Sequence, residues 1–305
     1  MKKKLIYRLW MLLCLMVLLK PVTADAITPL DPTRNCSLNI HYGAEGANFS
    51  GVTVQIYRVA AASPDGTFDL IEPFSGYPVN IHSITSQQEW RDTAATLVSY
   101  ITAERVPATA QAVTNEAGIA AFPQLKTGLY LVLGSSHTNL ERTYWFEDFL
   151  IYLPTPLNGG ESFDYDMDAK PKPTGVTVYD QYTVRKLWKD SGNSGNRPRE
   201  IYVDIFKNGE LYETVTLNAN NQWTYTWHTG SVGDRWTVLE RDIPNGYTVT
   251  VGTQDNVFTI TNSRNTPPSA PPKTGDTFPI WSCICVLAAS GILLILLGLS
   301  QKRRK

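Results

Sequence analysis

The chain has 305 residues, of which 43% are hydrophobic and 18% are charged, and its formal net charge is −1. This composition is typical of a globular protein and excludes a disordered or fibrous chain. Since no excess of Lys and Arg is available to neutralise phosphates, it also excludes a strongly basic nucleic-acid-binding protein. The length favours two domains.

The N-terminus has the three parts of a secretory signal peptide. Lys2 to Lys4 and Arg8 make it positive, residues 9–19 are uncharged and apolar, and Ala24-Asp25-Ala26 forms a small-x-small cleavage site. The apolar stretch is too short to cross a bilayer, which argues against the alternative of an N-terminal membrane anchor. We therefore predict that residues 1–26 are a signal peptide that is removed on export.

The first domain is predicted over residues 27–172 as a β-domain with one inserted helix. Short β-branched and aromatic runs, such as residues 52–57, 128–132 and 149–152, alternate with turn signals. Ser86 and Glu89 have the spacing of a capping box. Apolar residues at roughly helical spacing then follow, which predicts an amphipathic helix before Pro107.

A second domain is predicted over residues 173–265, and its boundary with the first falls within a short linker at residues 170–175. Alternating apolar and polar residues predict strands over residues 176–188 and 201–206, and Asn208-Gly209 is a strong hairpin signal. About seven short strands within roughly 90 residues are typical of an immunoglobulin-like sandwich. The expected fold class is thus mainly β, with two immunoglobulin-like β-sandwich domains in tandem, the first carrying an inserted α-helix.

The C-terminus combines a spacer, a pentapeptide, an apolar run and a basic tail. Residues 266–274 are rich in proline and predict an extended stem. Residues 280–299 are apolar and long enough to span a bilayer, and Lys302 to Lys305 follow on the side expected to stay in the cytoplasm. A plain stop-transfer anchor would explain the span and tail (residues 276–305), but not the pentapeptide Pro271-Pro272-Lys273-Thr274-Gly275 before them.

Pentapeptide, span and basic tail in this order resemble the LPXTG cell-wall sorting signal of Gram-positive surface proteins. The resemblance implies that a sortase cleaves between Thr274 and Gly275 and transfers the Thr274 carbonyl to an amine. That amine belongs to peptidoglycan or to a lysine of a neighbouring pilin subunit. Pro271 stands where the family has Leu, which leaves the class of sortase open.

Removing both ends changes the charge and cysteine content. Residues 1–26 hold five positive charges and one negative, and residues 275–305 hold four positive and one negative, so segment 27–274 carries a net charge of −8. Cys14, Cys283 and Cys285 lie in the ends, and only Cys36 remains. The exported protein therefore has no intramolecular disulfide, and Cys36 is expected to be incidental rather than a reactive thiol.

Several strands of the second domain resemble a Cna B-type domain, the repeat module of Gram-positive adhesin stalks and pilins. The resemblance rests on residues 183–188, 197–199, 223–227, 237–240 and 258–262. The first domain resembles the N-terminal domain of Spa-type pilins more loosely, through residues 52–59, the predicted helix and residues 122–131.

The Cna B-type resemblance implies a spontaneous isopeptide bond between Lys186 on the first strand and Asn262 on the last, assisted by Glu240. Burial lowers the pKa of a lysine and makes its amine nucleophilic, and a carboxyl kept protonated by apolar surroundings can shuttle protons. Three tryptophans could supply that apolar wall, namely Trp188, Trp223 and Trp227. Taken singly, an exposed lysine, a turn asparagine and a surface glutamate are commoner.

The first domain lacks these residue types. Lys126 is its single lysine between residues 27 and 169, and it precedes a turn glycine rather than lying on the first strand. We predict no isopeptide bond there. Lys172 lies roughly where polymerised pilins have their acceptor lysine, but the aromatic residue and the following Asn of that motif are missing, which favours a solvated linker lysine.

No cofactor or metal site is predicted, because His41, His82, His137 and His228 are scattered without paired spacing. The leading hypothesis is a non-enzymatic, wall-attached minor or basal pilin subunit or short adhesin. Its partners would be a sortase, then peptidoglycan or other pilin subunits, with a host or matrix ligand as a further candidate. The first alternative is a shaft pilin joined through Lys172. The second, of another class, is a wall-displayed hydrolase, although Glu104, Glu141 and Glu147 show no diagnostic spacing.

Overall fold

The structure is a computed structural model that describes residues 30–64, 66–82, 84–139, 142–157, 162–175, 179, 181–190, 195, 197–229 and 234–264. The predicted signal peptide, stem, sorting pentapeptide and C-terminal span lie outside these residues. Within them, no helix is long and apolar enough to cross a membrane. The described residues all belong to one compact unit that ends at Arg264.

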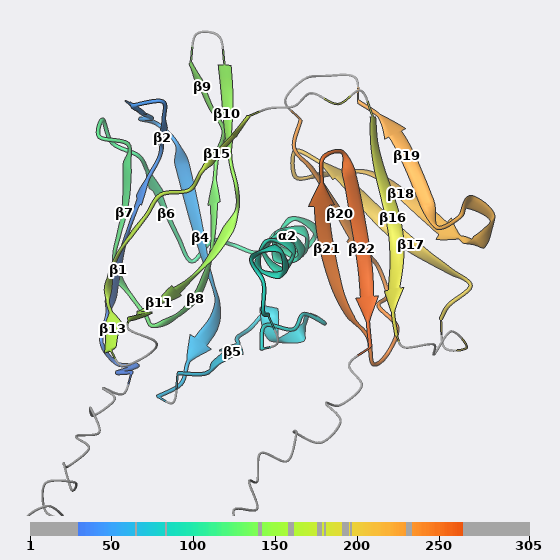
Figure 1. Cartoon of the computed structure of the whole chain (residues 1–305), viewed down its shortest axis with the longest axis horizontal. Coiled ribbons are helices and arrows are strands. Elements are labelled where there is room, and N and C mark those ends of the chain that lie inside the picture. Colours follow the sequence, from blue (N-terminus) through green and yellow to red (C-terminus); the bar gives the residue numbers. More distant parts are fainter. Residues whose placement is uncertain are drawn as a thin grey trace, which may run out of the picture. The chain divides into compact units, whose positions relative to one another are not determined.

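Among its described residues, the first half contains one α-helix, α2 (Gln87–Glu104), with short strands before and after it in the chain (Figure 1). The strands are β1 (Cys36–His41), β2 (Gly43–Ala44), β3 (Ala47–Asn48), β4 (Thr53–Ala62), β5 (Phe68–Leu70), β6 (Ala110–Val113), β7 (Ile119–Leu125), β8 (Gly128–Gly134), β9 (His137–Asn139), β10 (Arg142–Phe146), β11 (Phe149–Leu153), β12 (Thr155–Leu157), β13 (Ser162–Asp164), β14 (Asp166–Ala169) and β15 (Pro173–Gly175).

Two sheets of the first half pack face to face. One has the order β14–β1–β7 and the other β11–β8–β4–β5, with β6 also paired to β4. Strand β1 alternates buried and half-buried residues, and its Leu38 and Ile40 join Val54, Ile56 and Tyr130 in the core between the sheets. The period of two places one face of each strand in this core.

The second sheet is buried on its other face as well, because α2 covers it. Tyr57 of β4 and Leu129 and Leu131 of β8 pack with Leu97 and Ile101 of the helix. The helix begins as predicted, with a reciprocal capping box. Glu89 N donates to Ser86 Oγ at 3.2 Å, and Ser86 N donates to the Glu89 carboxylate at 3.0 Å.

The second half is a seven-stranded sandwich in the described residues. Its strands are β16 (Gln181–Lys189), β17 (Glu200–Lys207), β18 (Glu210–Asn218), β19 (Thr224–His228), β20 (Trp236–Glu240), β21 (Thr248–Gln254) and β22 (Val257–Ser263). One sheet has the order β19–β16–β22–β21 and the other β18–β17–β20. Asn208 (φ 53°) and Gly209 (φ 88°) make the predicted hairpin turn between β17 and β18. The expected fold class is confirmed.

The predicted linker over residues 170–175 is wrong in its last three residues. Pro173 to Gly175 form β15, which pairs with β10 so that Thr174 lies opposite Trp145. A proline is tolerated as the first residue of an edge strand, and it holds the preceding Lys172 extended. The chain therefore stays attached to the first half until residue 175.

The helix also packs against the second sandwich, so a second side of it is buried besides the predicted apolar face (Figure 1). Thr93, Thr96 and Ser99 are buried at three-residue spacing, and each hydroxyl donates to the carbonyl four residues earlier. Thr96 Oγ1 in addition accepts the backbone N–H of Val251 on β21 at 2.8 Å. A backbone N–H on the edge strand β21 is thus hydrogen-bonded by a side chain of the first half.

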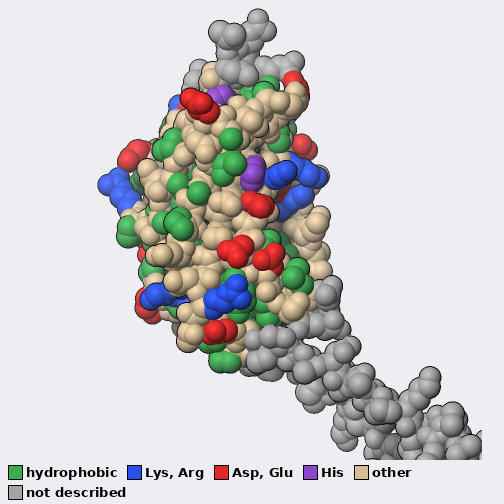
Figure 2. All heavy atoms as spheres, turned by 90° about the vertical axis from the view of Figure 1, so that its left-hand side faces the viewer, with side chains coloured by type: hydrophobic (Ala, Val, Ile, Leu, Met, Phe, Trp, Pro, Cys, Tyr) green, Lys and Arg blue, Asp and Glu red, His purple; other side chains and the backbone are tan. Residues whose placement is uncertain are grey.

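Figure 2 shows the face of the molecule over the sheet β14–β1–β7. Acidic and basic side chains are interspersed there with small apolar areas. Pairs along the edge of the sheet include Ser37 Oγ with Asp166 at 2.7 Å and His41 Nε2 with Asp168 at 3.1 Å. On this face, the residues that the structure describes form no large cluster of one charge.

The contact between α2 and β21 predicts the effect of Thr96→Val, an isosteric change. It leaves the buried N–H of Val251 without an acceptor, and we expect the free energy of unfolding to fall by about 1–3 kcal/mol. Thr93→Val is the control, because it removes the same kind of bond within the helix and no bond to β21. Urea denaturation measures both, and equal losses would contradict the role of Thr96.

Candidate functional site

Lys186, Glu240 and Asn262 come together in the interior of the second sandwich. Lys186 lies on β16 and Asn262 on β22, which are neighbouring parallel strands in a register that pairs Lys186 with Ile260 and Trp188 with Asn262. Alternation along both strands turns the two polar side chains inward. Glu240 ends β20 in the facing sheet, so the carboxyl meets the other two side chains across the sandwich.

The carboxyl of Glu240 bridges the amine and the amide. Lys186 Nζ is 3.1 Å from Glu240 Oε2, and both side chains have 0% exposure. Asn262 Nδ2 donates to Glu240 Oε1 at 2.8 Å. Buried charges occur in proteins only when they are paired, and here one carboxyl is the counter-ion of the lysine and also the hydrogen-bond acceptor of the amide.

One of the three predicted tryptophans lies directly against the amine. Lys186 Nζ is 4.3 Å from the ring centroid of Trp188. Trp223 meets Trp188 edge-on at 6.0 Å and forms an outer layer of the wall. Trp227 stacks instead on Phe258, at 6.0 Å, and also packs against Tyr182. These neighbours place Trp227 in the aromatic core of the sandwich, and its part in enclosing the lysine stays a prediction.

A second polar cluster lies at the end of β16, next to Trp188. The buried carboxylate of Asp190 accepts two N–H bonds from Arg197, at 2.8 and 2.7 Å, and the hydroxyl of Tyr247 at 2.9 Å. The guanidinium of Arg197 is 5.7 Å from the centroid of Trp188. In the sequence, Arg197 was noticed only as part of the Cna B-type resemblance, and Asp190 was not singled out. The available signal for Asp190 was an acidic residue directly after the strand that carries Lys186.

The surroundings move both ionisable groups toward their neutral forms. Burial, first, and the charge of Arg197 lower the pKa of Lys186 to about 8, although Glu240 opposes this shift. Burial raises the pKa of Glu240, partly offset by Lys186 and by the hydrogen bond from Asn262. A neutral amine and a carboxylic acid thus become accessible beside an amide.

The amide of Asn262 has an oxygen available for polarisation. Oδ1 is buried, and among the described residues it has no hydrogen-bond partner. A protonated Glu240 could donate to this oxygen after a half-turn of the amide, since the oxygen and nitrogen of an amide occupy equivalent positions. The arrangement therefore combines a nucleophile, an electrophile and a proton carrier, which are the groups that amide exchange needs.

The remaining predicted residues lie away from this cluster. Lys172 is exposed, directly before β15. Cys36 is buried on β1 with 2% exposure, and burial raises the pKa of its thiol to about 11, which makes it unreactive. The pentapeptide, Pro271 to Gly275, lies outside the described residues. Within them, no three His, Cys, Asp or Glu side chains gather as a metal site would require.

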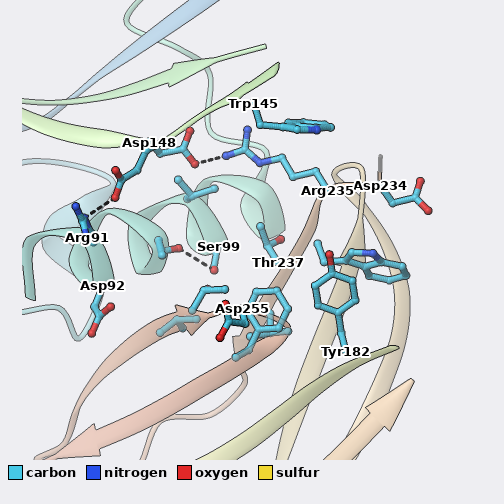
Figure 3. A pocket seen from close by; sticks show the side chains of 18 of the residues that line it. Arg91, Asp92, Ser99, Trp145, Asp148, Tyr182, Asp234, Arg235, Thr237 and Asp255 are labelled. Atoms are coloured by element: carbon cyan, nitrogen blue, oxygen red, sulfur yellow. Dashed lines mark hydrogen bonds and ion pairs between the residues drawn. The ribbon is translucent and has the colours of Figure 1, made fainter. Parts of the chain in front are cut away.

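A groove of about 780 Å³ is lined by residues of α2, β10, β20 and β21 (Figure 3). Lys172 lines it too, and ion pairs join Arg235 to Asp148 and Arg91 to Glu147. Of the glutamates considered for a hydrolase, Glu147 is held by Arg91 at 2.6 Å and Glu104 accepts the hydroxyl of Tyr77 at 2.7 Å, while Glu141 lies outside the described residues. These contacts do not make a pair of carboxyls facing one substrate.

Comparison with known protein families finds a match in the second domain. Residues 182–263, which include Lys186, Glu240 and Asn262, match the family model "Cna protein B-type domain". The collagen adhesin of Staphylococcus aureus is 34% identical over 136 residues, which cover 38% of this chain and 11% of the adhesin. The chain thus spans only that small share of its curated relative.

Two solved structures are similar at low identity. The full-length major pilin SpaD of Corynebacterium diphtheriae is 11% identical, and the match covers 77% of this chain and 99% of that one, with a TM-score of 0.30. A single B repeat unit of the collagen-binding surface protein of Staphylococcus aureus is 17% identical, with 76% and 100% coverage and a TM-score of 0.26. Scores this low carry no weight for the fold or the function.

The lowered pKa of Lys186 predicts how stability depends on pH when the amine is kept free by Asn262→Ala. The unfolded chain binds the proton up to the ordinary pKa of 10.5 and the folded chain only to about 8, so stability rises with pH between these values. At about 1.4 kcal/mol per pKa unit, the rise amounts to about 3 kcal/mol. Urea denaturation at several pH values measures it.

The control is Lys186→Met in the same Asn262→Ala chain. Because Lys186 also lowers the pKa of Glu240, the two profiles are compared only between pH 8 and 10.5, where Lys186 itself is expected to titrate. A difference that stays flat between these pH values would show that Lys186 is an ordinary solvated lysine.

Proposed function

We propose that this protein is a sortase-attached surface protein of a Gram-positive bacterium, a minor or basal pilin subunit or a short adhesin, whose second domain is cross-linked between Lys186 and Asn262. The cross-link rests on one observation, the burial of Lys186 Nζ 3.1 Å from Glu240 beside an amide held by the same carboxyl. The match of residues 182–263 to Cna B-type domains supports the assignment as a surface protein.

The reaction starts from the amine and carboxyl in their neutral forms. Lys186 Nζ attacks Cγ of Asn262 while the Glu240 hydroxyl polarises the amide oxygen. Glu240 takes a proton from the attacking nitrogen and gives one to Nδ2 as the Cγ–Nδ2 bond breaks. One amide bond forms, one breaks and ammonia leaves. The reaction runs once per molecule, so the protein is not an enzyme.

The bond would supply the covalent stabilisation that disulfides give other secreted proteins. Segment 27–274 contains a single cysteine, Cys36, which is buried in the first domain. A Lys186–Asn262 bond joins the first strand of the second sandwich to the last, and so closes a loop that includes nearly the whole domain. Closing a long loop removes more conformational entropy from the unfolded chain than closing a short one. The folded state is stabilised relative to the unfolded chain by the same amount.

The attachment to the wall rests on the order of segments at the C-terminus. A proline-rich stem, the pentapeptide Pro271 to Gly275, an apolar run and a basic tail follow the folded part. Cleavage after Thr274 would leave residues 27–274 attached to peptidoglycan or to another pilin subunit. We do not propose collagen as a ligand of this chain, because the match covers only 11% of the collagen adhesin.

The alternative of a shaft pilin joined through Lys172 is favoured by one observation. Lys172 is exposed between two prolines, directly before β15, so its amine is presented on a stretch of extended backbone. A sortase would then form the same kind of bond between Thr274 of one subunit and Lys172 of the next.

The first test is the intact mass of residues 27–274. We expect it to be lower than the sequence mass by one ammonia, because Nδ2 of Asn262 leaves. Lys186→Ala and Asn262→Ala should each restore the full mass, and Glu240→Gln should slow the loss at least tenfold. Arg185→Ala, a change at an exposed neighbour on the same strand, is the control. A wild-type chain of full mass sinks the cross-link.

The second test is expression of the full chain in a Gram-positive host with a pilus-type sortase. We expect muramidase to release a single species ending at Thr274. In Thr274→Ala the protein should remain in the membrane fraction, whereas Thr266→Ala, a stem threonine outside the pentapeptide, should behave as wild type. Polymer ladders that disappear with Lys172→Ala would favour the shaft pilin, and membrane retention of the wild type would refute sorting.

A further inference from the structure

The isopeptide site lies next to an open side of its own sandwich. Strands β20 and β21 end their respective sheets, so no strand of the second domain closes the gap between them. Glu240 is the last residue of β20. The element that packs against both edge strands is α2, which belongs to the first domain (Figure 1).

Tyr100 of α2 is part of the core of the second sandwich. It is 7% exposed and belongs to the same hydrophobic cluster as Val238, Leu239 and Val251 of the two edge strands. Its ring stacks on Tyr77 at 4.2 Å, which fixes its plane. A side chain of the first domain therefore fills a place that the second domain leaves empty.

Helix α2 packs on β20, and Tyr100 shares its hydrophobic cluster with Leu239, the residue directly before Glu240. Burial is the main cause that raises the pKa of Tyr100, and the carboxylate of Glu240 raises it further, followed by Glu104.

Three further contacts join the first domain to the open side of the second sandwich. Thr96 Oγ1 accepts the N–H of Val251, and the carbonyl of Pro78 accepts the N–H of Val249 at 2.9 Å. Arg235 of the segment before β20 forms an ion pair with Asp148 of the first domain (Figure 3). One of these bonds comes from α2 itself and two from other segments of the first domain, and together they hold that domain against the edge of the sandwich.

We propose that the first domain completes the isopeptide site of the second, with Tyr100 as the positioning residue that keeps water from Glu240, so that bond formation depends on the docking of α2. The proposal rests on the proposed cross-link and adds a requirement to it. Glu240 carries protons between nitrogens only while it is held neutral and dry. An open β20–β21 side would admit water, which stabilises the carboxylate and the ammonium and removes the nucleophile.

The test follows bond formation over time in residues 27–274 made by cell-free synthesis, with the fraction lacking one ammonia read by intact mass. We expect Tyr100→Ala to link at least tenfold more slowly than wild type. Tyr100→Phe keeps the ring and should link within twofold of wild type. Tyr130→Ala, which removes a buried tyrosine from the core of the first sandwich, controls for general destabilisation.

Each outcome has one meaning. A wild-type chain that never loses ammonia refutes the cross-link itself, whereas a wild type that links while Tyr100→Ala links equally fast overturns only the role of the first domain. Equal slowing by Tyr100→Ala and Tyr130→Ala also overturns it, as does slowing by Tyr100→Phe as large as that by Tyr100→Ala.

A second pair of variants decides the matter if Tyr100→Ala does not fold, as judged by tryptophan fluorescence. Thr96→Val weakens the contact of α2 with β21 and leaves Tyr100 in place, and we expect it to link at least threefold more slowly. Thr93→Val, which removes no bond to β21, should link at the wild-type rate. Equal rates for the two variants would overturn the proposal.

Discussion

The second sandwich is organised around the burial of one ammonium group. Removing Lys186 from water is costly unless a counter-ion and hydrogen bonds replace the solvent, and the carboxyl of Glu240 at 3.1 Å supplies the counter-ion. That ion pair requires β16 and β20, which lie in the two facing sheets, to be held at fixed positions opposite each other. It also requires Trp188 to cover the amine and Asn262 to occupy the second carboxyl oxygen. A buried ion pair of this kind contributes little net stability. Its burial instead makes the neutral amine and the carboxylic acid accessible beside the amide of Asn262.

The sequence was sufficient to predict most of the second domain and its candidate site. Strand alternation and the Asn208-Gly209 turn depend on local rules, and the structure follows them. Lys186, Glu240 and Asn262 came from a resemblance and not from pattern alone. Nothing in the spacing of residues 186, 240 and 262 indicates that the three side chains meet, because the contact is made by the pairing of the first and last strands.

The role of α2 could not be predicted, for a physical reason. The spacing of Trp90, Leu97 and Ile101 indicates one apolar face, and the structure buries that face against the first sandwich. A stripe that winds away from this face carries Thr93, Thr96 and Ser99, which look like exposed residues in sequence. They can be buried because each hydroxyl is satisfied by the helix's own backbone. A stripe of small hydroxyl residues at three-residue spacing was the available signal.

The position of the cross-link also determines how the protein would carry force. A chain anchored beyond Arg264 receives tension at the end of β22, and β22 lies beside β16 in a parallel pair. Without a covalent bond, the load would be borne by the hydrogen bonds between these strands and then by the rest of the sandwich. A bond between Lys186 and Asn262 passes the tension directly from the last strand to the first, so that strands β17 to β21 are bypassed. The chain then continues back through residue 181 toward β15, which is hydrogen-bonded to β10 of the first domain. The proposed cross-link would therefore protect the second sandwich, and the first domain would be the part that yields.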